Sequence, residues 1–241
     1  MYNLLSSMDA TGTVKKIISH KIPHVLIILS LILGNAVAQM PDDIPKFTIV
    51  RIKYDGGGDW YGNKTSLRNL LKFISEELMI PADIKEQTAS IMDETFFNYP
   101  LAYIAGHGNI KFSQDEADRL RTYLTSGGFL FADDDYGMDI YFRREMKKVF
   151  PELKFVELPF SHPIYNIYFN FPNGLPKIHE HAGGPPQGLG LIYEGRLVVF
   201  YSFNTDISDG CEDPEVHNDP PEKHEAALKM GLNILLYSLL Y

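Results

Sequence analysis

A short apolar segment that stops at a Gly-His-Gly turn constrains the fold of this chain more than any other feature. Residues 101–105 are apolar and lie between a proline and a glycine, which predicts a strand buried on both faces of a parallel sheet. Ser113 and Glu116 then have the spacing of a capping box, which predicts the first turn of a helix. Open α/β sheets bind ligands at such junctions of strand, turn and helix. His107, in the turn, is therefore a candidate site residue.

Strands and helices alternate along the rest of the chain. Apolar or alternating segments bounded by turn residues predict strands at 47–54, 82–89, 101–105, 128–132, 153–158, 189–193 and 197–203. Apolar periodicity and terminal signals predict helices at 63–78, 113–125, 140–150 and from Asp219-Pro220 onward, with a short turn or helix at 93–99. A long ordered loop is expected between 166 and 190. This order predicts a three-layer α/β sandwich with a mostly parallel sheet.

Polar residues follow several of these strands. Right-handed crossovers would place the turns after Tyr54, Ala105, Ala132 and Leu158 at one edge of the sheet. The ionisable side chains in those turns are Asp55, Asp59, His107, Asp133, Asp134, Asp135 and His162. Their expected convergence on one edge is the strongest functional signal in the sequence.

Three adjacent aspartates end the strand at 128–132. Their carboxylates repel one another unless a cation, a helix N-terminus or hydrogen-bond donors offset the charge. Because side chains alternate along an extended backbone, Asp133 and Asp135 should point to one face of the sheet and Asp134 to the other. Asp135 is the best placed to cap the helix that follows. We therefore expect Asp133 or Asp134 to be functional.

Two kinds of chemistry fit a histidine among carboxylates. His107 with Asp134 and His162 would form a mixed site suited to Zn²⁺, Mn²⁺ or Fe²⁺, and a bound water could then be activated for hydrolysis. Without a metal, His107 and Asp133 or Asp134 could act as a catalytic acid/base pair. The alternative is a turn histidine that only hydrogen-bonds to neighbouring backbone. His179 and His181 also have a spacing compatible with a metal, although a surface loop explains such a pair more often.

A glycine-rich loop follows the first strand. Consecutive glycines allow the backbone to turn tightly or approach a ligand closely. Asp55 and Asp59 disfavour a phosphate there, and the Lys-Ser/Thr pair of a phosphate-binding loop is lacking. The expected ligand-binding residues of this loop and its neighbours are Gly57, Gly58, Asp59, Trp60, Gly106, Gly108 and His162.

Charge restricts the class of partner. The chain carries a formal net charge of −9 and has a pI near 5.3, whereas nucleic-acid backbones are bound by basic faces. A nucleic-acid partner is therefore not expected, and an unidentified small molecule or protein is. The single cysteine, Cys211, lies among acidic residues that would raise its pKa and reduce its reactivity.

The first 38 residues have the pattern of a secretory signal. Three lysines precede an apolar run at 25–33, and Ala36-Val37-Ala38 supplies the small residues that signal peptidase recognises. Cleavage would leave a single domain at 39–241 in the periplasm or cell envelope. The alternative is an uncleaved anchor at 22–38, and membrane contact is expected only through this segment.

Several motifs together resemble domain of unknown function 4159, a bacterial family of exported or membrane-attached proteins. They are Gly-Gly-Gly-Asp-Trp-Tyr at 56–61, Gly-His-Gly at 106–108, the run from 120 to 135 that ends in Ala-Asp-Asp-Asp, His-Pro-Ile-Tyr at 162–165 and Gly-Leu-Asn-Ile-Leu-Leu-Tyr at 231–237. The family is similar to the class I glutamine amidotransferase-like fold, a flavodoxin-like α/β sandwich. The resemblance brings no established reaction.

Amidotransferases of that class place a cysteine nucleophile between glycines on the turn after a strand. The matching position here is His107, so the resemblance implies the fold without the acyl-enzyme chemistry. Two hypotheses follow. We favour a domain that binds a ligand or partner without catalysis, and the alternative is a metal-assisted hydrolase that uses His107 and the Asp133–Asp135 cluster.

Overall fold

The computed structural model describes residues 46–180 and 183–241, and the predicted signal or anchor segment lies outside them. The described residues form one seven-stranded sheet of order β2-β1-β3-β4-β7-β6-β5. The strands are β1 Val50–Ile52, β2 Gln87–Ala89, β3 Leu101–Ile104, β4 Phe129–Asp133, β5 Val156–Glu157, β6 Gln187–Tyr193 and β7 Arg196–Phe203. Strands β2, β1, β3, β4 and β7 are parallel, and β6 is antiparallel to both of its neighbours. The predicted, mostly parallel sheet is confirmed.

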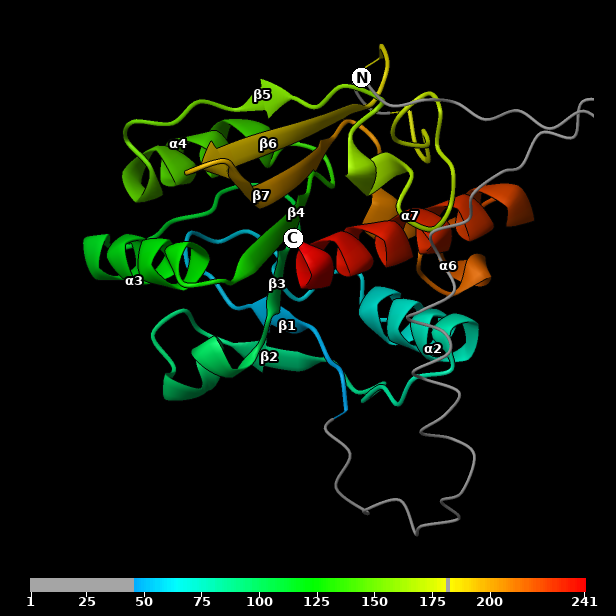
Figure 1. Ribbon diagram of the computed structural model, residues 1–241, viewed down its shortest axis with the longest axis horizontal. Helices are drawn as coiled ribbons and strands as arrows, with labels where there is room; N and C mark the ends of the chain where they lie inside the picture. Colours follow the sequence, from blue (N-terminus) through cyan, green and yellow to red (C-terminus); the bar gives the residue numbers. More distant parts are fainter. Residues whose placement is uncertain (1–45, 181–182) are drawn as a thin grey trace, which may run out of the picture. The chain divides into compact units, whose positions relative to one another are not determined.

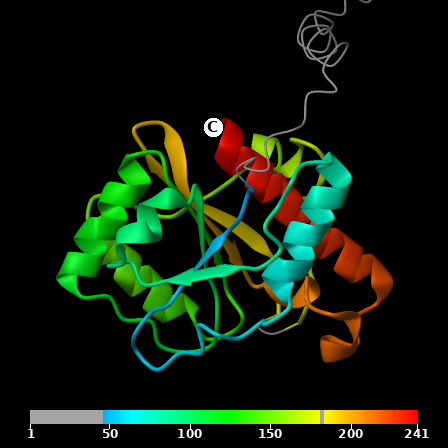
Figure 2. The ribbon, with the colours of Figure 1, turned by 90° about the horizontal axis from the view of Figure 1, so that it is seen from below.

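Helices cover both faces of this sheet, as the three-layer prediction required. They are α2 Ser66–Leu78, α3 Gln114–Thr125, α4 Asp139–Val149, α5 Ile207–Gly210, α6 Pro214–His217 and α7 Pro221–Leu240, with 3-10 turns η1 Glu94–Asn98 and η2 Pro163–Tyr165. Figures 1 and 2 show α2 and α7 on one face and α3 and α4 on the other. The architecture is α/β and is compatible with a flavodoxin-like fold.

The alternation of side chains along the central strands creates two hydrophobic cores. Tyr103 of β3 packs in the core beneath α2 and α7, whereas Ala102 and Ile104 of the same strand pack in the core beneath α3 and α4. All four residues of β3 are buried. This double burial explains why the strand is uniformly apolar in the sequence.

The local helix signals correspond closely to the structure. Ser113 Oγ accepts a hydrogen bond from the Glu116 backbone N–H over 3.1 Å, and Glu116 Oε2 accepts one from the Ser113 N–H over 2.8 Å. The predicted capping box of α3 is therefore confirmed. Differences occur where elements are very short. The strand expected at 153–158 is reduced to β5, and the acidic loop expected after 206 contains α5 and α6, each a single turn that apolar periodicity cannot reveal.

The parallel strands bring distant loops to one edge of the sheet. Because β1, β3, β4 and β7 run in the same direction, the residues that follow them share the carboxyl edge. The switch in the direction of sheet growth lies between β1 and β3, since α2 and α3 cover opposite faces. Ligand-binding residues are expected along this edge.

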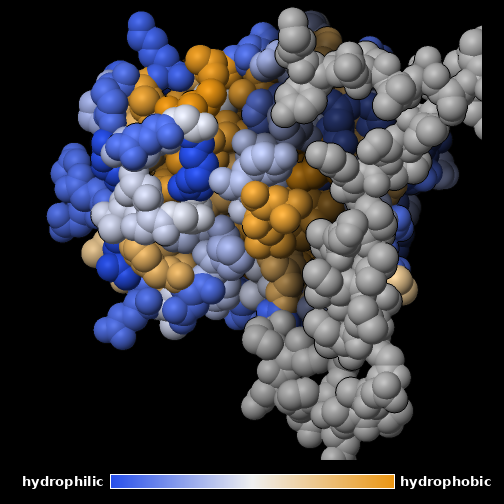
Figure 3. Space-filling view, viewed as in Figure 1, coloured by the Kyte–Doolittle hydropathy of each residue, from blue (hydrophilic) through white to orange (hydrophobic). Residues whose placement is uncertain are grey.

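The C-terminal helix α7 is the longest helix that the structure describes. Leu239, Leu240 and Tyr241 are exposed at its end, and Figure 3 shows hydrophobic residues gathered over this part of the surface. Within residues 46–180 and 183–241, no helix combines the length and the apolar character needed to cross a membrane.

Candidate functional site

Two of the three aspartates at the end of β4 point to the face covered by α7, where they bind the same serine. Asp133 Oδ2 accepts a hydrogen bond from the Ser208 backbone N–H over 2.6 Å, and the Ser208 hydroxyl contacts both Asp133 and Asp135. One hydroxyl hydrogen can be donated to only one of the two carboxyls, so the second contact is a hydrogen bond only if one of the acids is protonated and donates to the hydroxyl oxygen. Burial raises the pKa of Asp133 to about 7 and that of Asp135 well above its usual range. The two side chains thus form a buried acid pair closed off from solvent.

Asp134 points to the opposite face, as the alternation predicted. Its Oδ1 accepts a hydrogen bond from the Met138 backbone N–H over 3.2 Å, immediately before α4. The expectation that Asp135 caps this helix is wrong, because Asp135 faces Ser208 and Asn63 instead. Burial raises the pKa of Asp134 to about 6.

His107 pairs with Asp59 at the switch point between β1 and β3. The His107 backbone N–H donates to Asp59 Oδ1, and His107 Nδ1 lies 3.1 Å from Asp59 Oδ2. The histidine side chain is 53% exposed. Gly106 has a φ of +131°, and a Cβ there would lie 2.5 Å from the Tyr54 hydroxyl. A glycine is therefore required for the turn that presents His107.

The remaining predicted ligand-binding residues surround this turn. Gly58 packs against the His107 carbonyl, where a Cβ would lie 2.7 Å away, whereas Gly57 and Gly108 face open space. Trp60 packs edge to face against Tyr61 with their ring centroids 5.6 Å apart. Their roles in binding stay predictions.

A buried arginine that the sequence analysis missed holds the same loop in place. Arg51, in β1, donates hydrogen bonds to the carbonyls of Trp60, Gly62 and Asn63 and forms an ion pair with Glu86. Its position in an alternating strand gives no sign of this role.

The structure places His162 away from the other six ionisable groups. Its ring lies against Tyr237 near the end of α7, with the centroids 5.2 Å apart, and Tyr237 packs on Phe129 at the start of β4. Residues after β5 therefore cross to the amino edge of the sheet. Burial lowers the pKa of His162. The expectation that it joins His107 and the aspartates is corrected.

A different set of histidines and carboxylates meets at the carboxyl edge beyond β7. His179 Nδ1 lies 3.3 Å from Asp206 Oδ2 and 3.4 Å from Asp209 Oδ2. His217 Nε2 lies 3.8 Å from Asp209 Oδ2. One donor atom from each of His179, Asp209 and His217 falls within 4.8 Å of the others, and no second group of this kind occurs in the described part of the chain. The predicted set of His107, Asp134 and His162 is not such a group.

The segments that carry these donors are anchored by backbone hydrogen bonds. The backbone N–H groups of Ile178 and His179 both donate to the Thr205 carbonyl, two residues after β7. Asp209 belongs to α5, and His217 ends α6. The fold of the edge thus fixes the three donors, while His181, the second histidine of the predicted pair, lies outside the described residues.

The family model described as "Domain of unknown function (DUF4159)" matches residues 48–239. The chain belongs to this family. The match confirms the resemblance inferred from the motifs, and all the donors named above lie within the matched range. A comparison of the chain with curated proteins found no match.

Electrostatics in this DUF4159 domain favour a positive charge between the carboxylates. Hydrogen bonds to Asp206 and Asp209, and a further one to Asp219, raise the pKa of His179 to about 10 despite its partial burial. Without a cation the imidazole is therefore protonated at neutral pH and offsets its acidic neighbours. A metal ion bound here would take over that charge.

The sequence predicts only part of this group of donors. The spacing of His179 from His181 indicates a possible ligand, whereas Asp209 is only one of the acidic neighbours of Cys211. Two single-turn helices bring Asp209 and His217 to His179. Neither residue directly follows a strand, so the expectation that ligands bind at strand ends does not identify them.

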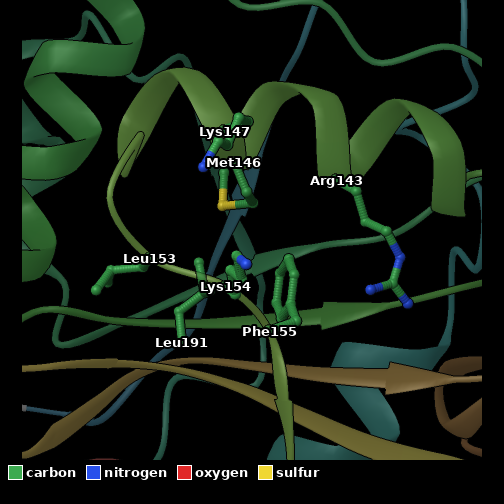
Figure 4. A pocket seen from close by; sticks show the side chains of 7 residues that line it. All are labelled: Arg143, Met146, Lys147, Leu153, Lys154, Phe155 and Leu191. Carbon is green, nitrogen blue, oxygen red and sulfur yellow. The ribbon is translucent and has the colours of Figure 1, made fainter.

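A cavity of about 360 Å³ lies elsewhere in the DUF4159 domain, between α4, the segment at 153–155 that precedes β5, and strand β6 (Figure 4). Its lining residues are Arg143, Met146, Lys147, Leu153, Lys154, Phe155 and Leu191. None of these is a predicted site residue, and the cavity is not part of the candidate site.

Proposed function

We propose that this domain binds one divalent transition-metal ion through His179, Asp209 and His217. The observation that supports the proposal is the spacing of the three donors. A tetrahedral ion with bonds of about 2.0–2.2 Å has its donor atoms roughly 3.3–3.6 Å apart. The contacts of 3.4 and 3.8 Å that Asp209 Oδ2 makes with the two imidazoles are close to this separation. Two imidazoles and a carboxylate favour Zn²⁺, Fe²⁺ or Mn²⁺ over Ca²⁺ or Mg²⁺.

The second oxygen of the Asp209 carboxylate also supports the proposal. Asp209 is 7% exposed, and its Oδ1 has no hydrogen-bond partner among the described residues. Leaving a buried carboxylate oxygen unsatisfied is costly. A cation beside Asp209 would remove that cost.

Calorimetric titration of the full chain with Zn²⁺ tests the proposal. We expect one equivalent of Zn²⁺ to bind the wild type and the His162→Ala variant with the same affinity. The His179→Ala/His217→Ala variant should not bind Zn²⁺ with that affinity. Equal binding by all three proteins would refute it.

Metal-assisted hydrolysis is the second candidate function. Three protein ligands leave a fourth position for water, as in catalytic zinc sites, and His217 is 30% exposed. The hydrolytic site would then be formed by His179, Asp209 and His217, and not by His107 and Asp133–Asp135 as the sequence predicted. Hydrolysis of an activated aryl ester or phosphate ester by the zinc-loaded chain, above the rate of free Zn²⁺ and of His217→Ala, would support it. Equal rates would contradict it.

The fold we infer is class I glutamine amidotransferase-like without a nucleophile. The parallel strands β2-β1-β3-β4 and the glycine-flanked turn after β3 support the inference. His107 occupies the turn, and Cys211 is buried elsewhere, where burial and the charges of Asp133 and Asp209 raise its pKa well above the usual range. We expect no glutaminase activity, and activity that Cys211→Ala abolishes would contradict this inference.

We further propose that the chain is exported to the periplasm or cell envelope. The lysines, the apolar run and the small residues of the first 38 positions support this. Cell fractionation with mass spectrometry of the N-terminus is the test. A mature start at Gln39, or an intact chain in the membrane fraction, agrees with export or with the anchored alternative, and an intact cytoplasmic chain contradicts both.

A further inference from the structure

The imidazole of His179 has two different neighbourhoods at its two nitrogens. Nδ1 faces Asp206 and Asp209, the side on which the ion is proposed to bind. Nε2 faces away from it and lies 3.2 and 3.0 Å from the two carboxylate oxygens of Asp219. Asp219 is 9% exposed at its side chain, so water competes little for this contact.

An imidazole can bind a metal through one nitrogen only if that nitrogen is deprotonated, and the proton then stays on the other nitrogen. A carboxylate that accepts this N–H fixes the tautomer and the ring orientation, and it makes the ligand nitrogen more basic. Asp219 is placed to do this for His179.

We propose that Asp219 is a positioning residue for the metal site, holding the Nε2–H tautomer so that His179 coordinates the ion through Nδ1. The inference rests on the proposed metal-binding function. In this arrangement Nδ1 is the nitrogen of His179 that binds the ion, and Asp219, which is not a ligand, controls the affinity of the site for the ion.

The start of α7 supplies the framework for this arrangement. Asp219 lies two residues before the helix, and Lys223 in its first turn donates from Nζ to the Ile178 carbonyl, next to His179. His224 Nδ1 lies 2.7 Å from the Gly210 carbonyl, beside Asp209. The same helical turn thus contacts two of the segments that carry proposed ligands, those of His179 and Asp209. The contacts of Asp219 with the imidazole and of Lys223 with the Ile178 carbonyl therefore hold His179 in this orientation.

The experiment compares the zinc affinity of full-length variants by competition with a chromophoric chelator. We expect Asp219→Ala to weaken Zn²⁺ binding by about 10- to 100-fold, the usual effect of removing such a partner. Asp219→Asn keeps an acceptor oxygen without the charge and should fall between Asp219→Ala and the wild type. Glu222→Gln, an exposed residue in the first turn of α7, is the matched control and should stay within about twofold of the wild type.

A second measurement needs no variant. Nitrogen-15 NMR of the zinc-loaded wild type, with labelled histidine, reports which nitrogen of His179 carries the proton. We expect a protonated Nε2 and a metal-bound Nδ1. A metal-bound Nε2, or equal affinities of Asp219→Ala and Glu222→Gln, would overturn this inference while leaving metal binding intact. Absence of zinc binding by the wild type would overturn the proposed function as well.

Discussion

Asn63 Nδ2 donates a hydrogen bond to Asp135 Oδ2 over 3.0 Å and so joins the loop after β1 to the buried end of β4. Asn63 also has a left-handed φ of +51°. Asn63→Ala should lose the hydrogen bond and strain the backbone, whereas Asn63→Gly should lose the hydrogen bond alone. We expect urea unfolding to show Asn63→Ala less stable than wild type by about 2–4 kcal/mol and Asn63→Gly by about 1–2 kcal/mol. Equal stability of all three proteins would contradict the contact.

Asp134 makes the stability of the domain depend on pH. Its pKa rises from 3.8 to about 6 on folding because the carboxyl group is buried. The folded state therefore holds this proton more tightly, and its contribution to the unfolding free energy is fully present below about pH 4 and lost as pH rises through about 6. Asp134→Asn keeps an acceptor for Met138 and removes the titration.

We expect Asp134→Asn to gain on the order of 2 kcal/mol over wild type at pH 7.5, and little at pH 4, in urea unfolding. Asp134→Ala, which also loses the hydrogen bond from Met138, should gain less. A gain for Asp134→Asn that is the same at both pH values would show that burial of the charge is not its cause.

Arg51 is the buried cation on which the loop at 60–63 depends. Arg51→Met would leave Glu86 and three loop carbonyls without their donor. Because the Glu86 side chain is 26% exposed, the larger cost is that of the partly buried carbonyls left without a donor, and we expect the unfolding free energy to fall by about 1–3 kcal/mol. Adding Glu86→Gln should recover part of it. Zinc affinity should be unchanged, because the proposed ligands lie on other segments.

The Gly106 turn offers a test of the steric argument at His107. Gly106→Ala combines an unfavourable φ with a Cβ 2.5 Å from the Tyr54 hydroxyl, whereas Gly108→Ala, at φ +84°, meets no atom within 4 Å. Thermal unfolding should show both variants destabilised, Gly108→Ala by about 1–2 kcal/mol and Gly106→Ala by clearly more. A smaller effect at Gly106 than at Gly108 would contradict the close packing.

Local and periodic signals predicted much of this fold. The capping box of Ser113 and Glu116, the buried strand at 101–104 and the opposite orientations of Asp133 and Asp134 follow from rules that act over a few residues. The family could also be identified, because its motifs extend along the whole domain.

The candidate site was harder to predict because the positions of its residues depend on the paths of the segments that connect the strands and the longer helices. His162 follows a strand of the expected direction, but the chain then crosses to Tyr237 at the opposite edge. Asp209 and His217 belong to single-turn helices that have no periodic pattern, and the position of Asp209 is set by the packing of α5 against α7. Non-local packing of this kind leaves no signature in the sequence.

The metal content of the full chain, purified without added metal and measured by elemental mass spectrometry, tests the central claim most directly. We predict about one equivalent of a transition metal in the wild type and in His107→Ala, and its loss in His179→Ala/His217→Ala. The comparison separates the site formed by His179, Asp209 and His217 from the one expected at His107. Wild-type protein without metal, or metal lost in His107→Ala and retained in the double variant, would contradict the account.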